Sequence, residues 1–353
     1  MKEDFLKYQT QTTTHPLAMA VDYAKGSYIY DTDGQRHLDF VAGVSACTLG
    51  HCHPRITEAV KSQLDKYLHV MVYGEYILQP AVDLTKLLAE HLPSTLQTTY
   101  LVNSGTEAIE GAMKLARRAT GRSEIIYAHH AYHGNTLGSL SVMGFEERKK
   151  AFRPLLPNCN PIQFNSEEDL SKITENTAAV LLETIQGGAG FIFPKNAYLK
   201  KVRKRCSEVG ALLILDEIQP GFGRTGKLFS FEHFGITPDI LVMGKGMAGG
   251  LPIGAFTASE ELMSLLSHAP SLGHITTFGG NAVIASAALA TLKEITESDL
   301  IPQTILKEKL FRNLLKHTLI KEIRGKGLMI AIIMESSEIA SKVILNCKNR
   351  GLR

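Results

Sequence analysis

A lysine and an aspartate in this chain each follow a short apolar run that is typical of a buried strand. Asp216 ends the run LLILD, and Lys245 follows DILVMG. In parallel α/β sheets, side chains at the carboxyl ends of strands face the crevice where ligands bind. A lysine in such a place is often only a solvated surface residue, but beside a ligand it can form a Schiff base with an aldehyde. A third motif favours the second interpretation.

That motif is NSGTEAIEGAM, which places Ser104, Gly105 and Thr106 at the start of a predicted helix. Ser104 by itself would be only a good N-cap. Free backbone N–H groups and the positive end of the helix dipole also make a helix start a phosphate site. An acid, a lysine and a phosphate site at one sheet edge together suit pyridoxal 5'-phosphate. The lysine would bind its aldehyde, the acid its ring nitrogen and the helix its phosphate.

The glycines that follow Asp216 match two nucleotide-binding patterns incompletely. Gly221-x-Gly223-x-x-Gly226 has the spacing of a dinucleotide fingerprint, but residues 216–220 separate it from the strand that it should follow directly. The same stretch resembles a P-loop, except that Leu228 stands where a Ser or Thr hydroxyl is needed for Mg²⁺. We therefore interpret these glycines as a tight, close-packed loop and not as a nucleotide site.

Strands and helices alternate from about residue 98 onward and could position these groups. The predicted strands are TTYLV, EIIYA, AAVLLE, ALLILDE and DILVMGK, and the helices between them include SGTEAIEGAMKLARRATG and NAYLKKVRKRCSEVG. Continuous apolar runs alternating with amphipathic helices indicate an α/β fold with a mostly parallel sheet covered on both faces.

Smaller units are predicted at both ends of the chain. GSYIYDTDGQRHLDF is typical of a hairpin around Asp33-Gly34, and it is expected to pack with a C-terminal α+β unit that contains the strand GLMIAIIM. We predict three segments: residues 1–55 as the N-terminal part of a small domain, 56–298 as the large domain, and 299–353 as the C-terminal part of the small domain. Another strand would be expected after NRGLR, so we expect a trimmed C-terminus.

Composition narrows the class of protein. The 353 residues are 44% hydrophobic and 21% charged, with a formal net charge of +3. No basic stripe, apolar membrane-length run or signal peptide stands out, so a cytoplasmic enzyme without a nucleic-acid or membrane partner is expected. The His51-Cys52-His53-Pro54 cluster lacks a second ligand pair, and we interpret it as a polar turn with a small buried thiol. No metal is expected.

Five motifs, in order, resemble the class III, or omega-amino acid, aminotransferases, and most closely their acetylornithine and ornithine branch. They are NSGTEAIEGAMKLAR, YHGNTLGSLSVMG, LLILDEIQPGFGRTG, MGKGMAGGLPIGA and TTFGGN. The resemblance covers about residues 27–334. It implies a fold type I transferase, with a large domain on a mostly parallel sheet of seven-stranded type and a small α+β domain. It also implies pyridoxal phosphate as the cofactor.

The resemblance implies roles for Lys245 and Asp216. Lys245 would form the Schiff base with the cofactor and, once displaced, carry the proton between the amino-bearing carbon of the substrate and the cofactor. Asp216 would pair with the pyridine nitrogen and keep it protonated, which makes the ring an electron sink. Glu217, beside it, should point away from the ring and make a structural pair.

Further cofactor contacts are implied by the same resemblance. Gln219 would contact the phenolic oxygen, Tyr132 would stack on the ring, and the helix start at Ser104, Gly105 and Thr106 would bind phosphate. His133, in the same motif, is expected mainly to support the loop. Thr277 would reach the phosphate in the neighbouring subunit, which implies an obligate homodimer with composite sites.

The substrate half of the site departs from the family pattern. The resemblance places Val44, Asn135, Glu183 and Gly188 near the substrate, with a supporting role for Glu183. The family usually has an arginine at the position of Asn135, which binds a substrate carboxylate, and a glutamate at that of Gly188. Asn135 cannot form a bidentate ion pair. A second family arginine belongs to a C-terminal segment that this chain lacks.

The predicted activity is therefore a ping-pong transfer of an amino group from an omega-amino acid, similar to acetylornithine or ornithine, to a keto acid such as 2-oxoglutarate. The departures leave the amino donor open, with 4-aminobutyrate or lysine as other candidates. Two alternatives remain. One is a pyridoxal phosphate enzyme of another reaction class, an aminomutase or a decarboxylase; the other is an inactive, truncated protein that still binds the cofactor.

Overall fold

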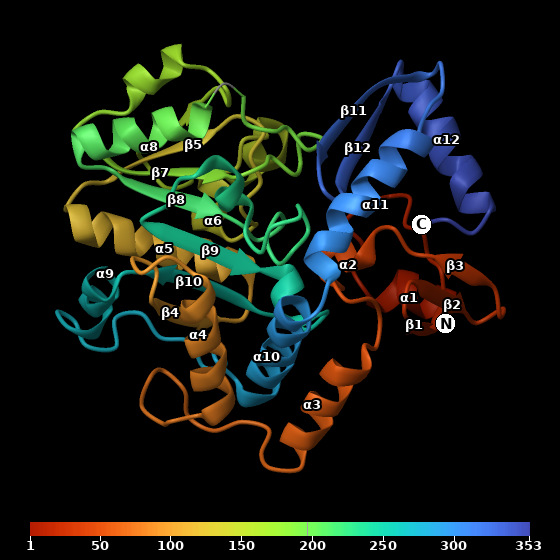
Figure 1. Ribbon diagram of the computed structural model, residues 1–353, viewed down its shortest axis with the longest axis horizontal. Helices are drawn as coiled ribbons and strands as arrows, with labels where there is room; N and C mark the ends of the chain where they lie inside the picture. The colour runs from red at the N-terminus through yellow and green to blue at the C-terminus, as the bar shows by residue number, and fades with distance from the viewer. Residues whose placement is uncertain (196) are drawn as a thin grey trace.

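The computed structural model describes residues 1–195 and 197–353, and a seven-stranded sheet forms its centre (Figure 1). In spatial order the strands are β4 (Thr98–Val102), β10 (Gly254–Ala258), β9 (Ile240–Gly244), β8 (Leu212–Asp216), β7 (Thr177–Glu183), β5 (Glu124–Ala128) and β6 (Cys159–Ile162). All neighbours are parallel except β10, which runs antiparallel to both β4 and β9. The α/β fold with a mostly parallel sheet is thus confirmed.

The register of three adjacent strands brings the chemical groups together. Glu183, the last residue of β7, is paired with Asp216, the last residue of β8. Asp216 in turn is paired with Val242 of β9, and Lys245 follows the end of β9. Every residue of β7 and β9 is buried, as expected for central strands that are covered on both faces.

Two layers of helices cover this sheet (Figure 1). On one face, α5 (Gly105–Thr120) packs against β9 and β10 and contributes more buried residues to one apolar cluster than any other element does. On the other face, a second cluster joins the sheet to three helices, which are α4 (Gln79–His91), α8 (Tyr198–Val209) and α10 (Ala282–Glu297). The remaining helices of this part are α3 (Pro54–Leu64), α6 (Leu137–Ser141), α7 (Glu146–Lys149) and α9 (Glu260–Ser264). The 3-10 turns are η1 (Lys150–Phe152), η2 (Glu168–Lys172), η3 (Ser230–Phe234), η4 (Lys245–Ala248) and η5 (Leu265–Ser267).

The two ends of the chain lie side by side, at the right of Figure 1. The N-terminal elements are α1 (Lys2–Tyr8), β1 (Val21–Lys25), β2 (Tyr28–Asp31), β3 (Arg36–Leu38) and α2 (Ala42–Ser45). The C-terminal elements are α11 (Leu300–Leu314), β11 (Ile320–Lys326), β12 (Met329–Met334) and α12 (Ser337–Asn349). The Leu38 N–H donates to the Gly351 carbonyl (2.7 Å), and the Phe40 ring contacts Phe311. The boundaries at residues 55 and 298 stay a prediction.

The glycine-rich loop after β8 is tight and closely packed, as predicted. Gly223 and Gly226 have φ values of +85° and +87°, in the region that favours glycine. A Cβ at Gly226 would lie 2.8 Å from Cγ1 of Ile305. These glycines thus fit the conformation of the chain and its contact with α11.

The turn at residues 51–54 differs from the prediction in one respect. The His51 side chain lies 2.8 Å from Asp39, but the Cys52 thiol is exposed, so the expectation of a buried thiol was wrong. Within the described part of the chain, no three His, Cys, Asp or Glu side chains converge as a metal-ion site would require. None of the helices in residues 1–195 and 197–353 has the length and apolar character needed to span a bilayer.

Candidate active site

A cavity of about 620 Å³ lies at the carboxyl ends of β7, β8 and β9, and most of the predicted site residues line it. Those residues are Val44, Gly105, Thr106, Tyr132, His133, Asn135, Glu183, Gly188, Asp216, Gln219 and Lys245. Two predicted residues do not line it. Ser104 lies just outside as the N-cap of α5, and Thr277 is exposed elsewhere on the surface.

Asp216 is buried, and both of its carboxylate oxygens are held. Oδ2 lies 2.7 Å from Nδ1 of His133, and Oδ1 accepts the N–H of Ile218 (2.9 Å). His133 is itself buried, and its Nε2 has no hydrogen-bond partner among the described residues. The prediction that His133 mainly supports its loop missed this contact. The fixed carboxylate suits a cationic ring nitrogen, because a nearby negative charge favours the protonated form.

Lys245 lies where β9 passes into η4, with φ +44°. A left-handed conformation costs a non-glycine residue about 1–2 kcal/mol, so the surrounding structure must hold it there. Burial lowers the pKa of the Lys245 amine, although the charges of Asp216 and Glu183 act in the opposite direction. A lowered pKa increases the fraction of neutral amine at neutral pH, and the neutral amine is the form that attacks an aldehyde.

Glu183 is buried at the floor of the cavity, where it connects two loops. Its Oε2 accepts the N–H of Tyr132 (3.1 Å), and its Oε1 accepts the N–H of Gly187 (2.9 Å). Burial raises the pKa of Glu183 to about 7, with a smaller contribution from the charge of Asp216. Glu183 therefore fixes the backbone on both sides of the cavity while it carries only part of a negative charge near neutral pH.

Glu217, the residue after Asp216, does not line the cavity, in agreement with the expectation that it points away from the ring. Its carboxyl group accepts the hydroxyl of Thr184 (2.6 Å) and the N–H groups of Ser230 and Phe231 (both 2.8 Å). Burial raises the pKa of Glu217 to about 8, against the effect of these hydrogen bonds. The sequence predicted a structural pair for Glu217. Its partners are instead three neutral groups: the Thr184 hydroxyl and the first two backbone N–H groups of η3.

The start of α5 closes one end of the cavity. The Ser104 hydroxyl caps the helix by accepting the N–H of Glu107 (3.4 Å). A Cβ at Gly105 would lie 2.7 Å from Cδ1 of Ile218, and one at Gly134 would lie 2.4 Å from Oγ1 of Thr106. Added side chains would thus crowd the backbone around a helix N-terminus, which is the environment that binds phosphate. This end of the cavity therefore fits the phosphate of pyridoxal phosphate.

Two polar side chains lie between the ends of the cavity. The Gln219 amide donates to Oγ of Ser45 (3.3 Å). Its Oε1 lies close to Gly187, where an added Cβ would be only 1.9 Å away. The Tyr132 hydroxyl accepts Nδ2 of Asn135 (3.1 Å). Val44, with φ +58° and 63% of its surface exposed, lies at the solvent side. A lysine, a carboxylate and a phosphate site around one cavity agree with the chemistry of a pyridoxal phosphate site.

Sequence reasoning missed one charged residue of this cavity, Arg148 of α7. It stands in FEERKK, where two acids followed by three basic residues are typical of a solvated helix surface. Its side chain is exposed, and its guanidinium carbon lies 4.9 Å from the centre of the Phe145 ring. No sequence signal distinguishes it from its basic neighbours Lys149 and Lys150.

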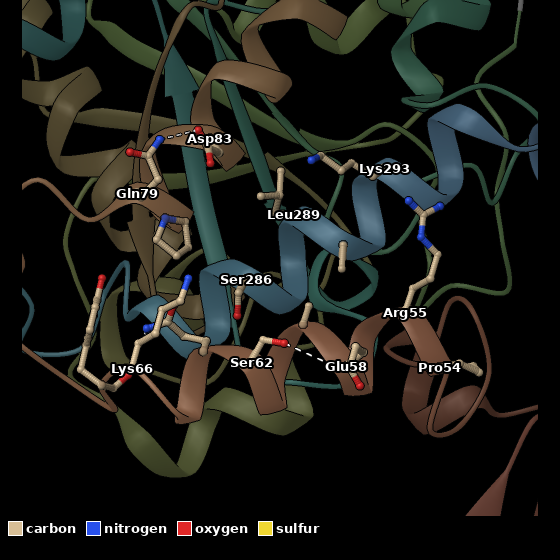
Figure 2. Close-up of a pocket in the computed structure, with 15 residues that line it drawn as sticks. Pro54, Arg55, Glu58, Ser62, Lys66, Gln79, Asp83, Ser286, Leu289 and Lys293 are labelled. Carbon is tan, nitrogen blue, oxygen red and sulfur yellow. Dashed lines mark hydrogen bonds between the residues drawn. The ribbon is translucent and has the colours of Figure 1, made fainter.

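A larger hollow, of about 900 Å³, lies between α3, α4 and α10, and contains none of the predicted site residues (Figure 2). Its polar side chains include Arg55, Glu58, Lys66 and Lys293 (Figure 2). Two of the hydrogen bonds there lie within a helix: Gln79 donates to Asp83 in α4, and Ser62 donates to Glu58 in α3. The smaller cavity, and not this hollow, holds the groups suited to catalysis.

The fold and the site together define a pyridoxal-phosphate-dependent transferase. The family model described as aminotransferase class-III matches residues 8–353, and the chain belongs to this family. It is therefore a pyridoxal-phosphate-dependent aminotransferase, with a small-molecule amino donor and a keto acid as substrates.

Relatives and solved structures agree with this assignment. An acetylornithine aminotransferase of Caldanaerobacter subterraneus is 39% identical over 98% of this chain and 88% of its own length. Another, from Methanocaldococcus jannaschii, is 40% identical over 94% of this chain and 86% of its own length. The structure of an ornithine aminotransferase from Toxoplasma gondii, with partial occupancy of pyridoxal phosphate, matches 100% of this chain and 86% of that chain at 29% identity, with a TM-score of 0.91.

Proposed function

We propose that this aminotransferase takes the terminal amino group of an omega-amino acid similar to acetylornithine or ornithine and transfers it to a keto acid such as 2-oxoglutarate. The observation that carries the proposal is the cavity in which Lys245, Asp216 and the start of α5 face one space. The names of the 39–40% identical relatives support this class of amino donor. A cytoplasmic location stays a prediction from the sequence.

Lys245 and Asp216 perform the chemistry in this proposal. Bound pyridoxal phosphate supplies an aldehyde that condenses with amines and a ring that accepts the electron pair left when a proton departs. Lys245 would hold the aldehyde of the bound cofactor through its Nζ and, once released, its amine would accept the proton from the amino-bearing carbon of the substrate. The Asp216 carboxylate, held in place by its contact with His133, would accept a hydrogen bond from the ring nitrogen of the cofactor.

Other residues of the cavity hold and orient the cofactor. Gly105 and Thr106 bind phosphate at the start of α5, where the helix dipole favours an anion. Gln219 and Tyr132 line the same cavity, where Gln219 would hold the phenolic oxygen and Tyr132 would support the ring. Glu183 organises the loops that carry Tyr132 and Gly187 through its two hydrogen bonds to backbone N–H groups.

A homodimer with composite sites is part of the proposal. Thr277 lies outside its own cavity, beside exposed apolar side chains. We define the 68/278 patch as Leu68, Ile275 and Phe278, which are all more than half exposed. The patch joins two distant segments, because Asn281 donates to the Leu68 carbonyl (2.9 Å) and Phe278 contacts His69. A contiguous apolar patch is typical of a protein interface, and pairing through it would present Thr277 to a partner subunit.

Single-turnover experiments with the cofactor-loaded protein test the proposed activity. Acetylornithine, ornithine, lysine, 4-aminobutyrate and glutamate are mixed separately with the protein, and the visible absorption of the bound cofactor is followed. At least one omega-amino acid should bleach that absorption, and 2-oxoglutarate should restore it while glutamate is formed. If no amine bleached it, or if the products were CO₂ or an isomerised amino acid, aminotransfer would be the wrong reaction for this site.

A further inference from the structure

The active-site cavity has an unassigned cationic side chain at its solvent side. Three basic residues line the cavity, namely Lys245, His133 and Arg148. Lys245 is assigned to the cofactor, and His133 contacts Asp216. We propose that Arg148 binds a carboxylate of the substrate, an inference that rests on the proposed function and specifies the substrate class of the same site.

The charges around Arg148 leave it available for an anion. Glu146 is shared between Arg153 (2.7 Å) and Lys149 (3.8 Å). The buried Lys149 amine also donates to the Tyr127 hydroxyl (2.8 Å), so it points away from the cavity. Within the described residues, the ion pairs of this segment leave Arg148 without a carboxylate partner. A substrate anion can therefore bind Arg148 without displacing an internal ion pair.

A stack of rings positions the Arg148 guanidinium. It lies over the Phe145 ring at 4.9 Å, and Phe145 packs edge-on against His130 with ring centres 5.5 Å apart. The Phe145 ring also adjoins the cavity floor, since a Cβ at Gly188 would lie 3.2 Å from its Cε2. An arginine that stacks by its face keeps the N–H groups of its edge free, and these match a carboxylate in a bidentate manner.

The rest of the lining explains why the cation is needed. Asn135 and Gly188 carry no charge, and the Asn135 amide already donates to Tyr132. Glu183 and Asp216 are acids and would repel a substrate carboxylate. A carboxylate that leaves water needs a cationic partner. A cofactor aldehyde held at Lys245 and the Arg148 guanidinium at the solvent side would thus select molecules with an amine at one end and a carboxylate at the other.

Ornithine and 1,4-diaminobutane form a matched pair for the test, because the second is ornithine without its carboxylate. The cofactor-loaded wild type and the variants Arg148→Gln, Arg148→Lys and Arg153→Gln are mixed with each amine in single-turnover experiments. Arg148→Gln should raise the half-saturating ornithine concentration about tenfold, because the charge pair with the substrate carboxylate is lost. The limiting rate should be almost unchanged, because this pair would stabilise the bound substrate and the transition state equally. Arg148→Lys should lie between, because it keeps the charge but not the fork.

The controls separate Arg148 from general effects of charge. Arg153 belongs to the same segment, is paired with Glu146 and does not line the cavity, so Arg153→Gln should leave ornithine saturation unchanged. Reaction with 1,4-diaminobutane should respond to neither change. Equal effects of Arg148→Gln on both amines, or equal effects of the two arginine variants on ornithine, would overturn the assignment.

Titration with glutarate provides a readout that needs no turnover. This unreactive dicarboxylate should bind the wild type and the Arg153→Gln variant, and bind Arg148→Gln about tenfold more weakly. If no amine reacted with the wild type, the proposed function would fail while the glutarate titration still tested Arg148. Unchanged glutarate affinity in Arg148→Gln, or no glutarate binding to the wild type, would show that Arg148 does not bind carboxylates.

Discussion

At the scale of single residues, burial acts in opposite directions on the acids and the amine of the cavity. Burial lowers the pKa of Lys245 and raises the pKa of Glu183 to about 7, so both groups shift towards their neutral forms. The Asp216 side chain is held in place, because His133 and the Ile218 N–H each contact one of its oxygens. Three neighbouring groups thus have three environments: a buried amine, a buried acid with a raised pKa, and a carboxyl group with a contact on each oxygen.

Replacing Asp216 by asparagine tests the function of the fixed anion. Asp216→Asn removes the charge that we propose for the ring nitrogen while preserving the size of the side chain. Loss of one preorganised electrostatic contact typically lowers kcat about 100- to 1000-fold, and we expect a decrease in this range. Steady-state kinetics measures it.

Glu217→Gln is the matched control for that change, because the neighbouring acid faces η3 and not the cavity. Measured on folded protein, it should retain a kcat within a few fold of wild type. A smaller loss in Asp216→Asn than in Glu217→Gln would place the essential anion elsewhere.

The sequence predicted the residues that terminate strands but not the contacts between distant segments. Asp216 and Lys245 could be found because each follows an uninterrupted apolar run, and strand ends meet at one edge of a parallel sheet. The contact of His133 with Asp216 joins residues 83 positions apart, and no local pattern indicates it. Arg148 was missed for a similar reason, since only the packing of Phe145 against Gly188 distinguishes it from neighbouring basic residues.

At the scale of elements, the close contact between α5 and the antiparallel strand β10 sets the position of the phosphate site. Gly111, in the middle of α5, is buried against Phe256 of β10. A Cβ at Gly111 would lie only 2.4 Å from Cε1 of Phe256. The absence of a side chain thus lets α5 approach the sheet, and the start of the helix moves with it towards the cavity.

Gly111→Ala separates this packing effect from helix propensity. Alanine in a helix interior is favoured over glycine by about 1 kcal/mol, whereas overpacking a core costs about 1–3 kcal/mol. Because Gly111 and Phe256 are both buried, we expect the cost of overpacking to exceed the gain in helix propensity. The expected net destabilisation is about 1 kcal/mol, measured by urea unfolding. Adding Phe256→Leu should make the effect of Gly111→Ala smaller in the double mutant. A stabilised Gly111→Ala variant would contradict the close contact.

Elements with strong apolar runs were predicted better than those built from small residues. EIIYA was predicted as a strand, and β5 spans these same residues, Glu124–Ala128. The strand β10 was missed because its sequence, GAFTA, has few of the branched and aromatic residues that indicate strands.

At the scale of the whole molecule, two buried glutamates make stability depend on pH. The pKa of Glu217 is raised to about 8 and that of Glu183 to about 7, whereas an unfolded glutamate has a value of 4.5. The folded apo-protein therefore holds more protons than the unfolded chain between these values. The stability that this proton uptake contributes is present in full below pH 4.5 and is lost as the pH rises to about 8.

Unfolding experiments across this pH range test the effect. For the apo-protein, the contribution of each group should fall by up to about 1.4 kcal/mol per pH unit within its window. Glu217→Gln, which cannot ionise, should show a shallower decrease between pH 5 and 8 than wild type. Equal slopes for the two proteins would show that Glu217 titrates in the folded state as it does in water.

The 68/278 patch should control assembly. Phe278→Asp places a charge on a side chain that is 57% exposed in the single chain and that would be buried in the proposed dimer. We expect a monomer with weakened cofactor affinity, because Thr277 would no longer reach the partner's site. Analytical ultracentrifugation measures the mass, and Leu345→Asp on α12 is the matched control. A dimeric Phe278→Asp protein would exclude this patch as the interface.

Borohydride reduction shows directly whether Lys245 is the residue that binds the cofactor opposite Asp216. Reduction of the cofactor-loaded protein converts a lysine–aldehyde linkage into a stable amine, and peptide mass spectrometry then identifies the modified lysine. We predict that the phosphopyridoxyl group is found on the peptide containing Lys245 and that Lys245→Ala carries none at any specific position. Stoichiometric modification of a different lysine in the wild type would show that Lys245 is not the residue that binds the cofactor.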